Sequence, residues 1–528
     1  MQQTAIAPPR RATRWAEPAA YVLLVAVALA LRLIALGDRV FHHDESQDAY
    51  FSWLFFRTGD YEYQPILHGP LRFYLTSLAY LAGGPSDFTA RLAPALMGTA
   101  IVVLPVLLRD QLGRVGALTT AAFLAFTPSY LYFSRFARED IYIACLTLAL
   151  LVVVFRFLER PRRHQPALIG GLLAASFATK ETTFITVFVA GTFFLVHTLR
   201  EARAAGSLRE APIARTVASV GWEAWAWGLA AFAGVFTLLF TTFLTHPAGL
   251  WAGIYDGLAY WLGQQPVGRG GEPWFYYLVV LFAEEWPALL LGGIGMVVAL
   301  RRPTLLRAFL VWAFGLSLAV YSWASEKFAW LVLHPLLPLL LLAGIGMQAI
   351  WDNRHRVAGK LGLVAAVACA AYVGVASWWV NVEYNADPRE FLVTTQSSPE
   401  VKRVSKEVLA RAAAARRQGR DLRVVVDTAD GATFPYAWYL RDLDDAAYVD
   451  LTRSALPDAD VAIVTAGGRA RQAAALRGYA GREFPFRVWW VRDYGAMSPA
   501  NWARWFTERK PWNPPGGMPE WLYVRRGA

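Results

Sequence analysis

The stretch "AYVLLVAVALALRLIALGDRVFHHDE", residues 20–45, places a cluster of titratable side chains directly after a long apolar run. A helix needs about 20 apolar residues to cross the hydrocarbon core of a bilayer, and the run over 18–37 meets that length. Charged groups beside lipid cost free energy and therefore tend to mark function. The stretch predicts a transmembrane helix that delivers a polar site to one face of a membrane.

The composition supports a membrane protein. Of 528 residues, 56% are hydrophobic and 17% are charged, and the mean hydropathy is +0.33. A soluble protein carries about a quarter charged residues. Cys145 and Cys369 both lie in apolar segments, where they are more plausible as small core residues than as a disulfide. No small-residue cleavage site precedes the first charged loop, so we expect no cleaved signal peptide.

Apolar runs of spanning length recur along the chain and predict a polytopic α-helical membrane protein with about 11 transmembrane helices. The fifth of these runs is short, and the eighth contains Glu284 and Glu285, so it could begin as an interfacial helix before Pro287. The expected spans are 18–37, 87–108, 115–133, 139–157, 166–179, 182–199, 222–244, 274–300, 304–323, 328–349 and 359–380.

The distribution of Lys and Arg between alternate loops predicts the orientation. One set of loops, which includes the N-terminal tail over 1–17, holds nineteen Lys and Arg, and the opposite set holds eight. Because basic loops stay in the cytoplasm, we expect a cytoplasmic N-terminus in the cytoplasmic membrane. The net charge of +11 is then explained by topology, and nucleic acid is not an expected partner.

The composition changes after Val380. Residues 384–528 alternate charged helical segments with short β-rich runs such as "LRVVVDT" and "DVAIVTA", which predicts a small α/β domain. With an odd number of spans this domain would be extracytoplasmic. We therefore expect a transmembrane domain over 18–383, with amphipathic helices in its first outer loop (38–86), followed by the extracytoplasmic domain.

Acidic and basic side chains gather in the loops predicted to lie outside. Each of five separate outer loops supplies at least one such side chain, which suggests a shared cavity at that surface. The residues are Asp44, Glu45, Asp48, His68, Arg138, Glu139, Asp140, Lys180, Glu181, Arg269, Glu326 and Lys327.

Each of these groups also has a simpler explanation. Asp44 and Glu45 could merely cap and charge the start of a short amphipathic helix. His43 with Asp44 could form a weak cation site, although no spacing here is diagnostic of a metal. The adjacent pairs at 180–181 and 326–327 could be solvated loop charges, and Arg138 could be an interface anchor. The conjunction on one side favours function over these readings.

The chain resembles the C-type superfamily of membrane glycosyltransferases, in the branch of dolichyl-phosphate-mannose–protein mannosyltransferases and the lipid A aminoarabinose transferase. Within that branch it is most similar to the flippase-activity-associated family of archaea and bacteria. The matching pieces are "HHDE", "YQPILHGPLRFYL", "FTARLAPALMG", "PSYLYFSRFAREDIY", "SFATKE", "EPWFYYL", "FPYAWYLRD" and "RWFTERKPWNP".

This resemblance implies that a sugar is transferred from a polyprenyl-phosphate carrier to an acceptor on the outer face. The superfamily's first-loop acidic residue falls on Asp44, with Glu45 beside it, and its second acidic position falls on Asp140, next to Glu139. The "HGPL" stretch stands where several relatives carry Lys-Pro-Pro, so His68 takes the place of a phosphate-facing lysine. An imidazole carries only part of a charge at neutral pH.

Transfer from a lipid phosphate needs a carboxylate for the acceptor's proton and cations for the leaving phosphate. We expect Asp44 to be the base of an inverting hexosyl or mannosyl transfer, with Glu45 or Asp140 orienting the acceptor. Glu139, beside Asp140, is counted with the catalytic carboxylates. Phosphate contacts would come from His68, Lys180, Lys327 and Arg269, and the binding site for the lipid phosphate and sugar would also include Arg138, Glu181 and Glu326. No cofactor is required, although the acidic cluster could hold a divalent cation.

The expected partners are the polyprenyl-phosphate sugar, a glycan, lipid or protein acceptor, and membrane lipids. Two other functions compete with transfer. A transporter or flippase for a lipid-linked sugar would place polar groups near mid-membrane, where the candidates are Arg32, Glu284 and Glu285. A flippase-associated scaffold without catalysis would tolerate the loss of Asp44 and Asp140.

Overall fold

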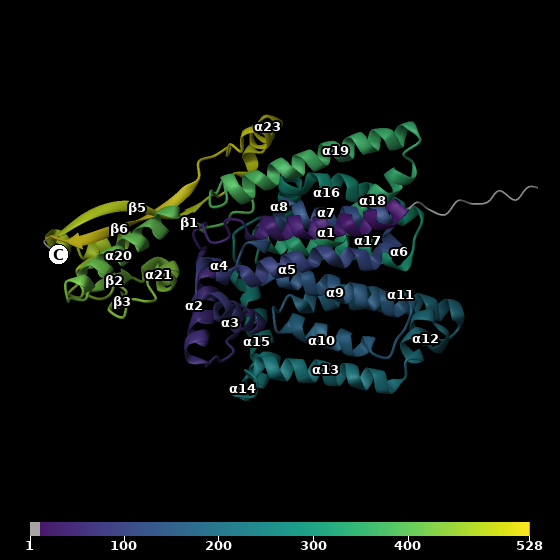
Figure 1. Ribbon diagram of the computed structural model, residues 1–528, viewed down its shortest axis with the longest axis horizontal. Coiled ribbons are helices and arrows are strands. Elements are labelled where there is room, and N and C mark those ends of the chain that lie inside the picture. The colour runs from purple at the N-terminus through teal and green to yellow at the C-terminus, as the bar shows by residue number, and fades with distance from the viewer. Residues whose placement is uncertain (1–10, 527–528) are drawn as a thin grey trace, which may run out of the picture.

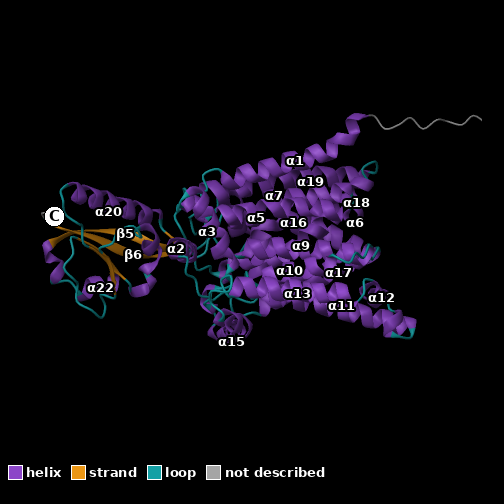
Figure 2. Cartoon of the chain, turned by 60° about the horizontal axis from the view of Figure 1, so that its bottom comes forward, coloured by secondary structure: helices purple, strands orange, loops and turns teal. Residues whose placement is uncertain are grey.

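The protein is a helical bundle with a β-sheet domain attached to one end. The computed structural model describes residues 11–526, and Figures 1 and 2 show all strands in the terminal domain and only helices in the bundle. Within this range nine helices are long and apolar enough to cross a membrane. Two further apolar helices, Arg114–Phe126 and Gln165–Phe177, are shorter. Together they account for the eleven expected spans, and the predicted fold class is confirmed.

The bundle is built from eleven helices, most of them close to the expected boundaries. These are α1 (Arg11–Leu33), α5 (Leu92–Val103), α7 (Arg114–Phe126), α9 (Asp140–Glu159), α10 (Gln165–Phe177), α11 (Thr183–Ala205), α13 (Trp222–Phe240), α16 (Tyr276–Arg301), α17 (Leu305–Trp323), α18 (Leu333–Asp352) and α19 (Val357–Trp378).

The shorter helices divide between the two ends of the bundle (Figure 1). Beside the β-sheet domain, at what we call the site end, lie α2 (His43–Thr58), α3 (Leu71–Gly83), α4 (Asp87–Ala90), α14 (Ala248–Trp251) and α15 (Gly257–Gln264). At the opposite, basic end lie the start of α1, α6 (Arg109–Leu112) and α12 (Pro212–Ser219). Loops rich in Lys and Arg therefore gather at one end, as the alternation predicts.

Helix α18 forms the centre of the bundle. It is apolar on every side and almost wholly buried, as expected of a helix surrounded by protein. Its packing against α16 depends on glycine, because a Cβ on Gly295 would lie 1.8 Å from the carbonyl oxygen of Leu342. Gly346 is equally restricted by the carbonyl of Leu291, at 2.2 Å. The two helix backbones approach closely only because both positions lack a side chain.

Helix α16 corrects the expectation of an interfacial helix before Pro287. The helix is continuous through Tyr276–Arg301 with a kink at Glu285, and the carboxyl groups of Glu284 and Glu285 are both fully buried in protein. The backbone N–H of Ser129 donates to Glu285 at 2.9 Å. Ser129 belongs to α8 (Pro128–Ser134), which follows α7 after a break at Thr127. Glu284 accepts from the backbone N–H of Phe391 at 3.2 Å and lies 3.7 Å from Arg509, so both carboxylates are enclosed by protein.

The domain at the C-terminal end, here called the tail domain (residues 396–526), is a mixed six-stranded sheet of order β1-β5-β6-β4-β2-β3. β3, β2 and β4 are parallel, whereas β6, β5 and β1 add antiparallel pairings. The elements are β1 (Gln396–Ser397), α20 (Pro399–Arg417), β2 (Val424–Asp427), α21 (Thr433–Tyr439), β3 (Ala446–Val449), β4 (Val461–Thr465), α22 (Ala466–Arg471), β5 (Tyr479–Trp489), α23 (Pro499–Glu508) and β6 (Gly516–Arg525).

The tail domain contacts the bundle at several places. Trp438 of α21 is fully buried, packs on Phe41 and Tyr80, and donates to Asp87 at 2.8 Å. Between β5 and β6 the chain returns to the bundle over 490–515, a stretch we call the return segment, and its helix α23 lies beside the end of α19 (Figure 1). There Trp505 is fully buried among bundle residues. The tail domain is thus held next to the loops that carry the charged residues.

Candidate active site

Asp44 and Glu45 lie in the first turn of α2, and the capping of this helix gives them different roles. His42 is the N-cap, and its Nδ1 accepts a hydrogen bond from the N–H of Asp44 at 3.1 Å. Glu45 completes a capping box by accepting from the N–H of His42 at 3.0 Å. The capping explanation therefore fits Glu45, while the carboxylate of Asp44 remains available for other contacts.

Glu45 is enclosed by hydrogen-bond donors. Arg91 donates to its two oxygens at 2.7 and 2.9 Å, Arg39 at 3.2 Å, and the N–H of Ala137 at 2.9 Å. Burial opposes its charge, but Arg91 and Arg39 outweigh that cost and lower the pKa of Glu45 to about 2. With no exposed surface, Glu45 joins α2 to the loops around it and has no face for a substrate.

Asp44 is the more accessible carboxylate, since its side chain is 25% exposed while that of Glu45 is not exposed at all. It forms an ion pair with Arg138. Burial again opposes the charge, and Arg138 and the histidines His42 and His43 overcome it, so the pKa of Asp44 falls to about 2. Asp44 is therefore an ionised carboxylate at neutral pH that a substrate can reach.

A chain of ion pairs connects Asp44 with Asp140. Arg138 contacts Asp44 and also Glu139, at 3.0 Å. The Nζ of Lys180 lies 3.2 Å from Glu139 and 2.9 Å from Asp140. Side chains from three separate loops, around 44, 138–140 and 180, are thus brought into one buried network.

His68 and Glu181 lie on the other side of Glu139. The Nε2 of His68 is 3.1 Å from Glu139 and its Nδ1 is 2.8 Å from Glu181. Both contacts are hydrogen bonds when each ring nitrogen carries a hydrogen. The ring stacks on Trp261 of α15 at 4.5 Å, nearly parallel. The backbone of His68 has φ 61° and ψ −163°, a region that is almost restricted to glycine, so the residue is held in a strained conformation.

Arg269 and Lys327 lie beside this network. The backbone N–H of Lys327 donates to the carbonyl of Arg269 at 3.0 Å, and the guanidinium of Arg269 is 5.7 Å from the ring of Trp261. The Nζ of Lys327 is bound to the carbonyl of Ala324. Through Trp261, Arg269 is one contact removed from His68, whereas Lys327 is joined to this group only by its backbone bond to Arg269. Glu326 is half-buried in the same loop.

Several residues of the network escaped the sequence analysis. Arg72 bridges Asp48 and Glu139, the latter at 2.6 Å, and lines a cavity of about 10 Å³ that has room for one water. Its place four residues after His68 in "HGPLRFY" was the available signal. Arg39, Arg91 and His334 carry no comparable pattern, because single cations at span ends resemble membrane anchors.

In the structure, the two residues of the proposed weak cation site, His43 and Asp44, each contact an arginine. Asp44 pairs with Arg138. The Nδ1 of His43 lies 2.9 Å from the guanidinium of Arg487 in β5. Across residues 11–526 no group of three His, Cys, Asp or Glu side chains is arranged to hold a metal.

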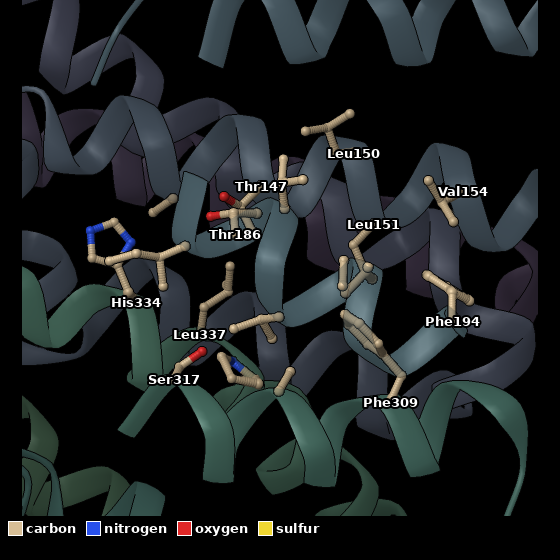
Figure 3. A pocket seen from close by; sticks show the side chains of 18 of the residues that line it. Thr147, Leu150, Leu151, Val154, Thr186, Phe194, Phe309, Ser317, His334 and Leu337 are labelled. Carbon is tan, nitrogen blue, oxygen red and sulfur yellow. The ribbon is translucent and has the colours of Figure 1, made fainter. Parts of the chain in front are cut away.

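An apolar cavity of about 260 Å³ reaches the network from within the bundle. It lies between α9, α10, α11, α17 and α18. His334 stands at one end of it, and Val154 and Phe194 at the other (Figure 3). The Nε2 of His334 is 3.4 Å from Asp140, and its ring stacks on Tyr321 at 4.9 Å. The cavity is therefore apolar along its length, and it is connected to the network through His334, which lines the cavity and contacts Asp140.

The structure thus combines a multi-pass helical bundle, a buried acid–base network at one end, an apolar cavity connected to this network through His334, and a sheet domain at the same end. A family model described as dolichyl-phosphate-mannose-protein mannosyltransferase matches residues 67–210. This match includes His68, Arg138, Glu139, Asp140 and Lys180. No curated protein matches the chain in sequence.

Solved structures share the fold at low sequence identity. ArnT from Cupriavidus metallidurans bound to undecaprenyl phosphate has a TM-score of 0.59 and 17% identity, over 86% of this chain and 94% of that one. AglB, the oligosaccharyltransferase of Archaeoglobus fulgidus, in complex with an inhibitory peptide and a dolichol-phosphate, has a TM-score of 0.53 and 11% identity, over 89% and 73%. The expected resemblance is thereby confirmed at the level of the fold.

Proposed function

We propose that this protein transfers a hexose from a polyprenyl-phosphate donor to an acceptor hydroxyl at the site end of the bundle. The observation that carries the proposal is that an apolar cavity ends at His334, whose imidazole contacts Asp140 of the buried acid–base network, with Lys180 paired to the same carboxylate. A substrate made of an apolar chain and a phosphate needs both environments side by side. A soluble sugar nucleotide would have no use for the cavity.

The cavity suits the prenyl chain, and the network suits the phosphate. A chain lying between Val154 and His334 would direct its phosphate toward Lys180, with His68 next to it. Arg269 lies over Trp261, which stacks on His68, and Lys327 is bonded to the backbone of Arg269. Cations around a leaving phosphate stabilise the charge that develops on it in the transition state. ArnT and AglB, which share the fold, are described with undecaprenyl phosphate and a dolichol-phosphate.

Asp44 is the proposed base. The acceptor oxygen attacks the anomeric carbon as the carbon–oxygen bond to phosphate breaks, and polyprenyl phosphate leaves with that electron pair. The hydroxyl proton passes to Asp44. Because the Arg138 pair lowers the pKa of Asp44 to about 2, the carboxylate orients the hydroxyl first. It accepts the proton only as the new bond forms and the hydroxyl becomes strongly acidic. A single displacement inverts the anomeric carbon.

Glu45, Glu139 and Asp140 serve this reaction by holding its cations. Glu45 fixes α2 through Arg91 and Arg39, and Glu139 holds Arg138, Lys180 and His68 together. The reaction as written requires no metal or cofactor. The acceptor is a glycan, lipid or protein hydroxyl that reaches Asp44 from the non-cytoplasmic side of the cytoplasmic membrane, where the tail domain also lies.

The test compares wild type and Asp44→Asn in proteoliposomes supplied with labelled polyprenyl-phosphate hexose and candidate acceptors. Loss of the base should slow transfer by about 100-fold or more, with unchanged expression and unchanged binding of polyprenyl phosphate. Asp458→Asn is the matched control, because Asp458 pairs with Arg423 on the exposed surface of the tail domain. Full transfer by Asp44→Asn would refute its role as base, and a product with retained configuration would refute single displacement.

A further inference from the structure

Glu272 joins the loop that carries Arg269 to the return segment. One of its carboxylate oxygens lies 3.1 Å from a guanidinium nitrogen of Arg492, and the other accepts a hydrogen bond from the hydroxyl of Tyr494. The side chain of Arg492 is 4% exposed and that of Glu272 is 16% exposed. Breaking a shielded charge pair costs more than breaking an exposed one, because the remaining charge is left without its partner and little screened by solvent and salt.

Arg492 itself is fixed in place. Its second terminal nitrogen donates to the carbonyl of Phe391 at 3.3 Å, and its guanidinium stacks on the ring of Phe391 at 4.5 Å. Phe391 in turn packs on Trp490 and Trp505 in the aromatic core shared with the bundle. The return segment therefore offers Glu272 a rigid partner.

The loop held by this contact has little structure of its own. Gly268, Gly270 and Gly271 all have φ between 62° and 91°, which only glycine adopts without strain. A Cβ on Gly270 would lie 2.2 Å from the carbonyl of Lys327, so the loop runs directly against the 324–327 connection. Such a chain depends on contacts at its ends to keep one conformation.

The other end of the loop reaches the active-site network. Gln264 accepts from Arg269 at 2.6 Å, and Arg269 lies over Trp261, which stacks on His68. Only Gly270 and Gly271 separate Arg269 from Glu272. The contact at Glu272 therefore determines where a cation stands relative to His68 and Lys327, although Glu272 touches none of the network residues itself.

We propose that Glu272 is a positioning residue, through which Arg492 and Tyr494 of the return segment hold the Arg269 loop over the phosphate end of the donor site. This inference rests on the proposed function for the identity of the ligand. It assigns the return segment a role in donor binding, in addition to any role of the tail domain toward acceptors. Opening of the contact frees Arg269 and uncovers the stacked Trp261.

Reversal of charge tests the contact without any ligand. Arg269 is the only Lys or Arg between residues 216 and 300, so tryptic cleavage there cuts the chain in two and reports how often the loop opens. Glu272→Arg and Arg492→Glu should each speed this cleavage about tenfold, which corresponds to about 1.4 kcal/mol. The double variant should return to within about threefold of wild type. Trypsin does not cleave the bond before Pro273, so the substitution at 272 adds no site.

Binding of radiolabelled undecaprenyl phosphate in detergent micelles tests the consequence. Each single reversal should weaken binding about tenfold and the double variant should restore it, a rescue that a general loss of packing would not produce. Tyr494→Phe, a milder change, should give a smaller effect in the same direction. Glu407→Arg is the control, because Glu407 pairs with Arg482 at 2.7 Å on the tail-domain surface.

The outcomes separate this inference from the proposed function. Cleavage at wild-type rate in both single variants, or no rescue in the double variant, would overturn the contact. The positioning role would be overturned if cleavage rose in the single variants and was rescued in the double variant, but the binding of undecaprenyl phosphate was unchanged in all of them. If the wild type bound no undecaprenyl phosphate, the donor class and the positioning role would both fall, while the cleavage rates would still decide whether Glu272 holds the loop.

Discussion

Lys180 shows how much the network depends on a single charge. Its ammonium group lies between Glu139 and Asp140, all three side chains are 3% exposed or less, and solvent cannot replace it. Lys180→Met should lower the free energy of unfolding by about 3–5 kcal/mol, because it leaves buried carboxylates without their cation. Thermal unfolding in detergent measures this loss.

Adding Asp140→Asn to Lys180→Met should recover part of the loss, since it removes one of the stranded charges. Lys510→Met, at an exposed position after α23, should leave stability unchanged. A fall in stability of equal size for Lys510 and Lys180 would contradict the role of the buried pair.

Single residues were predictable from sequence where loops that are predicted to share one side carry acidic groups next to apolar spans. Asp44, Glu139, Asp140 and Lys180 were found on that basis, and the structure brings them into one network. Arg91 was not predicted as a site residue, because its partner Glu45 lies 46 residues away and nothing in the local sequence marks an arginine as buried. His334 sits in a wholly apolar helix start and becomes notable only through Asp140.

At the scale of helices, α16 offers a matched pair of glycines. Gly295 faces α18, where a Cβ would meet the carbonyl of Leu342, whereas Gly293 has nothing within 4 Å. Gly295→Ala should therefore destabilise the protein by about 1–3 kcal/mol through overpacking. Gly293→Ala should be neutral or stabilise by about 0.5–1 kcal/mol, because alanine favours helix. Unfolding of the two variants in detergent compares them directly, and equal effects would contradict the close approach of α16 and α18.

Hydropathy was sufficient to place the spans, because apolar length is a local property of the sequence. Hydropathy did not reveal the break between α7 and α8 or the kink at Glu285. These two features are joined by the hydrogen bond from Ser129 to Glu285. The N–H groups at the start of α8 need an acceptor, and Glu285 supplies one across the bundle. Such a pairing between residues 129 and 285 has no signature within either helix.

For the whole molecule, the alternation of charged loops predicts which end faces the cytoplasm. The start of α1, α6 and α12 share the basic end, and the tail domain lies at the site end (Figure 1). The docking of the tail domain on α2 and on the Arg269 loop could not be predicted, because it rests on contacts such as Trp438 with Asp87 and Arg492 with Glu272. These join segments more than 200 residues apart.

The orientation can be measured with introduced cysteines, since the natural Cys145 and Cys369 are both buried and give little background. A membrane-impermeant maleimide applied to intact cells should label Ser454→Cys, on the exposed surface of the tail domain, and should label Ser207→Cys, after α11, only once the membrane is permeabilised. Basic loops are retained in the cytoplasm, so residue 207 should be inside and residue 454 outside. The reverse pattern would place Asp44, Lys180 and the tail domain in the cytoplasm. The site end would then face soluble sugar nucleotides, and a lipid-linked donor on the far side of the membrane could not reach it.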